Sequence, residues 1–123
     1  MKTAICFAVS FLLMGPPAHA YEVETGAALI CDTQRQVERF AQVFDQSLEV
    51  AINTVNIEEN NPTACAMVDV AYVQGPKLGT ARGASHTFKI IPIMVVGANT
   101  PNGYRLVEPA PVLMLVEIRE IAI

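Results

Sequence analysis

Apolar residues follow two different spacings along this chain, and the spacing changes at Cys65. Between Cys31 and Cys65 they recur every three or four residues, which is typical of amphipathic helices with one buried face. From Cys65 onward they recur at every second position, which is typical of strands with one buried face. The chain is therefore predicted to hold a helical part followed by a sheet.

The first helix is predicted to begin after Thr33. Thr33 and Gln36 have the spacing of a capping box, in which each side chain bonds an otherwise unpaired backbone amide of the first turn. The apolar stripe that follows has the spacing i, i+3, i+4, i+7 and consists of Val37, Phe40, Ala41 and Phe44. Polar residues between these positions give the helix a solvent-exposed face.

A second helix is predicted to begin after Ser47, a residue type that caps helix N-termini well. Its apolar stripe repeats the same spacing and consists of Leu48, Ala51, Ile52 and Val55. The sequence Asn-Asn-Pro at 60–62 ends it. Two short helices with a tight connection form an αα-hairpin. A single bent helix over 33–56 is the alternative, and the polar residues 45–47 favour the hairpin.

The alternating part predicts the strands of a sheet. Residues 65–73 form the first strand, with the side that carries Val68, Val70 and Tyr72 facing the core. Further strands are expected around 78–82, 87–96, 104–108 and 112–121. Pro92 cannot donate a ladder hydrogen bond, so it is expected at an edge or a bulge.

Residues 21–30 precede both parts and are expected to form an irregular or partly extended lead-in. The chain of 123 residues has room for one domain. We therefore expect a single α+β domain over 21–123. An N-terminal αα-hairpin would pack on a mostly antiparallel sheet of four or five strands, with one disulfide.

Residues 1–20 have the pattern of a secretory signal peptide. A positive start at Lys2 precedes an apolar run of eleven residues over 4–14, and Ala18 and Ala20 supply the small residues of a cleavage site. Eleven residues fall short of the ~20 that span a bilayer. Cleavage near Ala20 would leave the mature chain periplasmic or secreted, with no stable membrane insertion.

Charge narrows the set of partners. The net charge is −4 at pH 7, and loss of the positive charge of Lys2 makes it −5. Nucleic-acid binding needs clustered lysine and arginine to neutralise phosphates, and a membrane-surface binder needs a polybasic segment. A mildly acidic chain argues against both classes.

The cysteines reduce to one pair. Cys6 lies in the signal segment, so Cys31 and Cys65 remain in an oxidising compartment and can pair within one chain in only one way. The chain-entropy model gives such a bond about 3–4 kcal/mol of stabilisation. Two free thiols or an intermolecular bridge are the alternatives. A thioredoxin-like role has no support, because the chain lacks a C-x-x-C motif.

Few side chains are candidates for chemistry. His86 is the one histidine after the signal segment, and Asp69 is a carboxylate in the middle of an apolar strand. A small periplasmic hydrolase would need them to converge in one pocket. The simpler interpretation is a solvated loop histidine and a solvent-facing or Arg-paired aspartate. Neither a metal site nor a cofactor site is predicted.

A candidate binding loop lies in the polar, glycine-rich stretch 74–86 and just beyond it. Its cationic residues are Lys77, Arg82, His86 and Lys89. They could form an anion-binding turn, but the glycine spacing is not that of a phosphate loop, and a strand rather than a helix follows. The alternative is a mobile polar hairpin loop.

Three segments carry a resemblance to other proteins. They are A-L-I-C-D-T-x-x-Q-V-E-R-F, V-N-x-E-x-N-N-P-T-A-C and V-A-Y-V-x-G. Together they resemble a group of small exported proteins of rhizobia and related alphaproteobacteria. The paired cysteines and the N-N-P-x-A-C turn are the more specific elements. The resemblance implies export and a disulfide, and it implies no activity, cofactor or catalytic residue.

Two functional hypotheses follow. The first is a small exported, disulfide-stapled, non-enzymatic binding domain of the cell envelope, whose expected partner is another envelope protein. Exposed strand edges and the loop 74–86 are its expected contact surfaces. The alternative is the hydrolase-type enzyme that uses Asp69 and His86.

Overall fold

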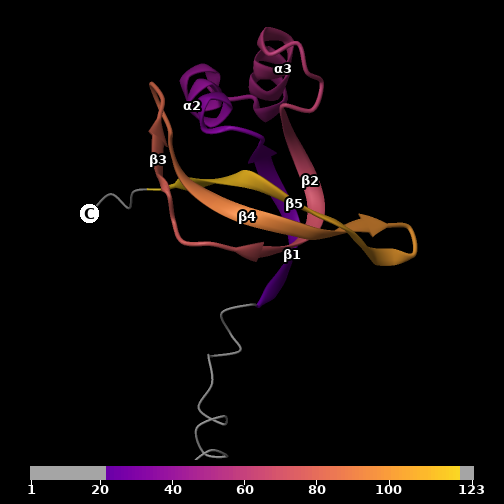
Figure 1. The fold of residues 1–123 in the computed structure, drawn as a ribbon. Coiled ribbons are helices and arrows are strands. Elements are labelled where there is room, and N and C mark those ends of the chain that lie inside the picture. The colour runs from indigo at the N-terminus through magenta and orange to yellow at the C-terminus, as the bar shows by residue number, and fades with distance from the viewer. Residues whose placement is uncertain (1–21, 120–123) are drawn as a thin grey trace, which may run out of the picture.

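The computed structural model describes residues 22–119 and shows two helices packed on a five-stranded antiparallel sheet (Figure 1). The elements in chain order are β1 (Val23–Cys31), α2 (Gln34–Val43), α3 (Leu48–Glu58), β2 (Cys65–Gln74), β3 (Gly79–Arg82), β4 (Thr87–Thr100) and β5 (Gly103–Ile118). The expected α+β class is confirmed, as is the αα-hairpin. The predicted signal segment, residues 1–20, lies outside the described residues.

Both helices begin where their capping residues predict. The Thr33 side chain accepts a hydrogen bond from the Gln36 amide at 3.2 Å, and the Gln36 side chain accepts one from the Thr33 amide at 3.0 Å. Ser47 caps α3 by accepting from the Val50 amide at 3.1 Å. Just past the end of α3, Asn60 adopts the left-handed conformation with φ 52°, a region that asparagine enters more readily than most residues.

The sheet closes on itself. Its strand order is β2–β1–β5–β4–β3, and β2 also pairs with β4, so β1, β2, β4 and β5 form a closed ring. β2 and β3 lie end to end along one side of β4, because Gln74 pairs with Ile93 and Gly79 pairs with Ile90. Pro92 lies opposite the gap between them. It is therefore in an interior strand, at a point where the neighbouring strand is interrupted, and not at an edge.

Two apolar clusters lie on opposite faces of the strands. The cluster under the helices includes Leu29, Val37, Phe40, Ala41, Ala51, Val55, Phe88, Ile90 and Leu115. The cluster on the other face includes Ala28, Val70, Tyr72, Ile91, Ile93, Val95 and Met114. Three residues of the predicted first helix stripe are therefore fully buried, while Phe44 packs against the first cluster from its margin. Val70 and Tyr72 face the core as expected, and Val68 packs against the same cluster.

The disulfide between Cys31 and Cys65 is confirmed. The two residues face each other on β1 and β2, with Cα atoms 4.1 Å apart, and their exposed fractions are 0% and 1%. The backbone amide of Asp32 donates to the carbonyl of Ala64 at 3.0 Å immediately beyond the bond. The bond therefore closes the base of the helical hairpin, where the chain leaves β1 and returns into β2.

Two strand predictions differ from the structure. The lead-in, predicted to be irregular or partly extended, is a complete strand, because residues 23–31 pair with β2 along their whole length. The segments 104–108 and 112–121, predicted as two strands, belong to one strand, because β5 runs unbroken from Gly103 to Ile118. Over residues 103–112 β5 pairs only with β4. Prolines are tolerated there because that stretch is an edge.

Candidate functional site

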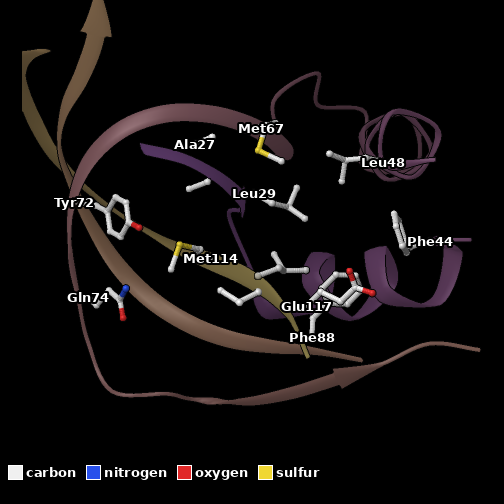
Figure 2. A pocket seen from close by; sticks show the side chains of 13 residues that line it. Ala27, Leu29, Phe44, Leu48, Met67, Tyr72, Gln74, Phe88, Met114 and Glu117 are labelled. Atoms are coloured by element: carbon white, nitrogen blue, oxygen red, sulfur yellow. The ribbon is translucent and has the colours of Figure 1, made fainter. Parts of the chain in front are cut away.

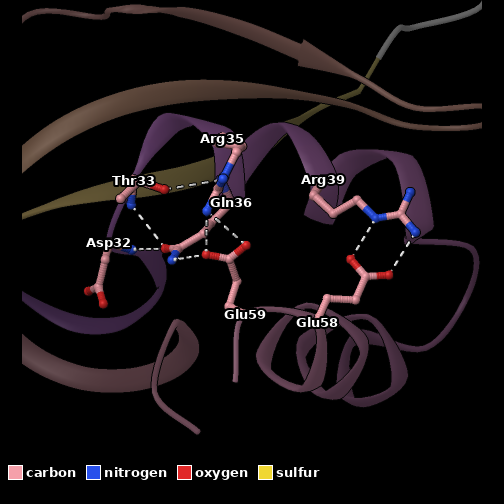
Figure 3. Close-up of polar contacts among 7 residues, drawn as sticks. All are labelled: Asp32, Thr33, Arg35, Gln36, Arg39, Glu58 and Glu59. Carbon is pink, nitrogen blue, oxygen red and sulfur yellow. Dashed lines mark hydrogen bonds and ion pairs between the residues drawn. The ribbon is translucent and has the colours of Figure 1, made fainter. Parts of the chain in front are cut away.

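The polar contacts between the helices are structural. Arg39 donates to both carboxylate oxygens of Glu58 at 2.8 Å, and Arg35 lies 2.9 Å from Glu59 (Figure 3). The hydrogen bond from Arg39 lowers the pKa of Glu58, and hydrogen bonds from Gln36 and then Arg35 lower the pKa of Glu59. These carboxylates hold α3 against α2, so they are not free to act on a ligand.

The structure does not gather all four residues of the candidate binding loop. Arg82 and His86 line a polar hollow of about 740 Å³ at the β3–β4 turn, and Lys77 and Lys89 are not among the residues that line it. Lys77 lies between β2 and β3, whereas Lys89 is on β4 opposite Thr80. The hollow is also lined by Thr80, Gly83, Ala84, Ser85, Thr87, Glu117, Ile118 and Arg119.

His86 joins three parts of the fold. Its Nδ1 lies 2.6 Å from the Glu117 carboxylate on β5, and its Nε2 lies 3.1 Å from the carbonyl oxygen of Asp45 in the α2–α3 connection. The imidazole packs edge-on against the ring of Phe44 at 4.7 Å between centroids. Each ring nitrogen thus faces an oxygen from a different part of the chain. These contacts hold the β3–β4 turn against the helices.

Asp69 lies near the other end of β4. Its carboxylate accepts hydrogen bonds from the Tyr104 hydroxyl at 2.6 Å and from the Asn99 side chain at 2.9 Å. The hydrogen bond to Asp69 raises the pKa of Tyr104. Thr87, next to His86, and Asn99 are twelve positions apart along β4, so the partners of His86 and of Asp69 lie near opposite ends of that strand. The structure therefore does not bring Asp69 and His86 together.

The β4–β5 hairpin projects away from the helices (Figure 1). Residues 101–111 are all exposed. Leu106 has an exposed fraction of 91%, and Tyr104 and Val107 are also exposed large residues on the same strand. Several exposed apolar side chains close together indicate an interaction surface, whereas isolated exposed apolar residues are common and indicate nothing.

An apolar cleft of about 570 Å³ lies where β1 and β5 separate (Figure 2). The two strands pair at only three positions, Leu29 to Cys31, and diverge beyond them. The opening is surrounded by residues of β1, β2, β4 and β5 and by residues where α2 ends and α3 begins. They are Ala27, Ala28, Leu29, Phe44, Leu48, Met67, Tyr72, Gln74, Phe88, Met114, Leu115, Val116 and Glu117. The sequence does not predict this cleft, since no local pattern signals where two strands part.

The described residues contain no group of three or more His, Cys, Asp or Glu side chains that could hold a metal ion. Between residues 22 and 119, none of the helices is long and apolar enough to cross a membrane.

Comparison with known proteins found no matching family, no matching curated protein and no matching solved structure. The resemblance to alphaproteobacterial exported proteins therefore stays a prediction.

Proposed function

We propose that this chain is a small exported, non-enzymatic binding domain of the cell envelope that recognises another protein through the projecting β4–β5 hairpin. The observation that carries the proposal is the 91% exposure of Leu106 on β5. Around Leu106, the side of β5 that does not face β4 pairs with no other described strand. The buried disulfide supports an oxidising compartment. The resemblance to exported proteins supports the same location.

The free edge of β5 suggests how a partner would bind. An extended segment can add to an exposed sheet edge, where main-chain hydrogen bonds give affinity and side-chain pockets give specificity. Pro109 and Pro111 have no backbone N–H, so they interrupt the edge as a hydrogen-bonding template. The stretch to which a partner strand could add is therefore 103–108. It carries Tyr104 and the apolar pair Leu106 and Val107, and the charged residues Arg105 and Glu108 flank that pair.

The hydrolase alternative gains no support from the site geometry. It needs Asp69 and His86 within hydrogen-bond reach of one substrate. The Asp69 carboxylate instead bonds Asn99 and Tyr104. The His86 imidazole contacts Glu117. We therefore do not propose an enzymatic function.

A photo-crosslinking amino acid placed at position 106 tests the proposal in exporting cells. Position 57 is the matched control, because Ile57 is a large apolar residue with an exposed fraction of 78% on α3, far from the hairpin in sequence. We expect one discrete crosslinked protein from position 106 and none from position 57. We also expect Leu106→Glu to abolish co-purification of that protein and Ile57→Glu to preserve it.

Equal crosslinking from both positions, or a complex that survives Leu106→Glu, would contradict binding through the hairpin. The location is tested separately by the mass and N-terminal sequence of the exported chain. A mature chain that begins at Tyr21 and is two hydrogens lighter than its reduced form is the expected result. A chain that stays in the cytoplasm with residues 1–20 still attached would refute export.

A further inference from the structure

We infer that the cleft at the β1–β5 seam binds an uncharged single-chain amphiphile, with the hydrocarbon chain under the helices and the polar head at Tyr72 and Gln74. This site is separate from the hairpin proposed to bind a protein partner. It lies at the opposite part of β5, on residues 114–117, whereas the hairpin uses residues 103–108. The two proposals can therefore fail independently.

The shape of the cleft favours a chain over a compact ring. Figure 2 shows the labelled side chains spread along the opening, with Tyr72 and Gln74 at one end and Phe44 and Leu48 at the other. Met67 lies between the two ends. The volume of about 570 Å³ falls within the range of roughly 300–1,000 Å³ that is usual for small-molecule sites.

The seam explains why the cleft is apolar and open. A continuous β1–β5 ladder would bring Ala28 opposite Val116 and fill the space, but the pairing stops at Leu29 and Leu115. Side chains from both apolar clusters, such as Leu29 and Met114, therefore line one opening. Met67 has an exposed fraction of 47%, so apolar surface that the fold leaves uncovered is available to a ligand.

Charge selects the head group. Among the described residues that line the cleft there is one carboxylate, Glu117, and no lysine, arginine or histidine. An anionic head at Tyr72 and Gln74 would lose hydration without gaining a cationic partner. A cationic head there would also lose hydration unpaired, because Glu117, the one lining carboxylate, lies toward the other end beside Phe88 and is 2.6 Å from His86. The Tyr72 hydroxyl and the Gln74 amide are uncharged groups that both donate and accept hydrogen bonds, and they match a hydroxyl, amide or ester head.

Three probes with one chain length test the inference on the oxidised mature chain. They are 1-decanol, decanoate and decylammonium, titrated at neutral pH by calorimetry. We expect saturable binding of 1-decanol and at least about tenfold weaker binding of both ions. We also expect affinity to rise by about three- to fourfold for each methylene added between 1-hexanol and 1-decanol, as burial of a chain in an apolar groove requires.

Two methionines give a matched pair of variants. Met67 lines the cleft and Met94 does not, and their exposed fractions are 47% and 40%. Met67→Glu is expected to weaken 1-decanol binding at least about tenfold, and Met94→Glu is expected to leave it unchanged. Leu106→Glu, which tests the protein-binding hairpin, should also leave it unchanged. If Met67→Glu lowers the melting temperature, Ala27→Phe replaces it, because Ala27 is exposed and its enlargement fills the same cleft.

The inference is overturned by any of three results. The first is that none of the alcohols binds saturably. The second is that decanoate or decylammonium binds as tightly as 1-decanol, which would refute the head-group assignment. The third is that Met94→Glu weakens binding as much as Met67→Glu, which would place the ligand outside the cleft.

Discussion

The turns at the two ends of β4 differ in how closely the rest of the fold packs against them. At the Thr87 end, the β3–β4 turn packs against the helices. An added Cβ at Gly83 would lie 1.9 Å from the carbonyl oxygen of Ala41 in α2, and His86 contacts both β5 and the α2–α3 connection. At the Thr100 end, residues 101–111 are exposed throughout. One end of β4 is thus packed against the helices, and the other is exposed to solvent.

The difference shows that glycine and polar residues do not by themselves make a loop mobile or functional. The stretch 74–86 was expected to be the binding loop because it is polar and rich in glycine. In the structure its last residues are held by close backbone contact and by His86, and its glycine at 83 serves packing. The apolar, more ordinary-looking sequence 103–108 is the exposed one.

The largest difference is expected between two leucines of the same strand. Leu115 is 5% exposed and pairs with Ile90 near the packed end, while Leu106 is 91% exposed and pairs with Gly97 near the free end. Leu115→Ala should lower the free energy of unfolding by about 2–5 kcal/mol, because it leaves a cavity under the helices. Leu106→Ala should change it by less than about 0.5 kcal/mol. Urea denaturation of both variants measures the contrast, and equal losses would refute it.

Gly83→Ala is expected to have the next largest effect. The new methyl group would overlap the backbone of Ala41, which cannot rotate away, so the turn must move from the helices. We expect a loss of about 2–3 kcal/mol in the free energy of unfolding. Gly79→Ala is the matched control, because nothing lies within 4 Å of a Cβ there. Similar stability of the two variants in urea denaturation would mean that the turn is not packed as described.

His86→Phe separates the polar contacts of the packed turn from its apolar contact. The phenyl ring keeps the edge-on contact with Phe44 and removes both hydrogen bonds, so Glu117 loses a partner at 2.6 Å. We expect a loss of about 1–2 kcal/mol by urea denaturation at neutral pH. Ser85→Ala, at the exposed neighbouring position, should change stability by less than about 0.5 kcal/mol. No loss in His86→Phe would show that packing alone holds the turn.

The smallest effect is expected at the base of the free hairpin. The hydrogen bond to Asp69 raises the pKa of Tyr104, so the protonated phenol stabilises the fold. This contribution is fully present below about pH 10, the ordinary pKa of tyrosine, and is lost as the pH rises through the raised value. Tyrosinate absorbance should therefore show Tyr104 titrating above the ordinary range, and Asp69→Asn should bring it back.

Tyr104→Phe should remove this part of the alkaline loss of stability, with a smaller effect at neutral pH than His86→Phe. Thermal melting across the alkaline range measures it. Titration of Tyr104 at the ordinary value in the unmodified chain, or an unchanged titration in Asp69→Asn, would contradict the contact. Either result would leave the hairpin base without its polar anchor.

Local signals predicted the helices and the disulfide well. Capping acts within three residues, so Thr33, Gln36 and Ser47 set the helix starts without reference to the rest of the fold. The cysteine pair followed from counting. The strand β1 was missed because Gly26 and nearby charged residues obscure its alternation, and only pairing with β2 makes it a strand.

The candidate sites depend on contacts between distant residues, which no local pattern contains. Asp45 and Glu117, the partners of His86, are 41 and 31 residues away from it in sequence. The cleft exists because β1 and β5 part after three pairs while β2 closes onto β4. Likewise, Leu106 reads as an ordinary strand residue, and it is exposed because β1 pairs with β5 only further along.

The position of the disulfide also bears on the order in which the bond and the strand pairs can form during synthesis. Cys65 emerges 34 residues after Cys31, once both helices have been synthesised and before β4 and β5 have appeared. The bond can therefore form while only β1, the helical hairpin and β2 are present. An oxidase that meets the chain as it emerges would produce a closed unit of paired β1 and β2 strands. The last two strands would then complete the ring, with β5 adding to β1 and β4 adding to β2, at the two outer edges of a pair that is already covalently joined.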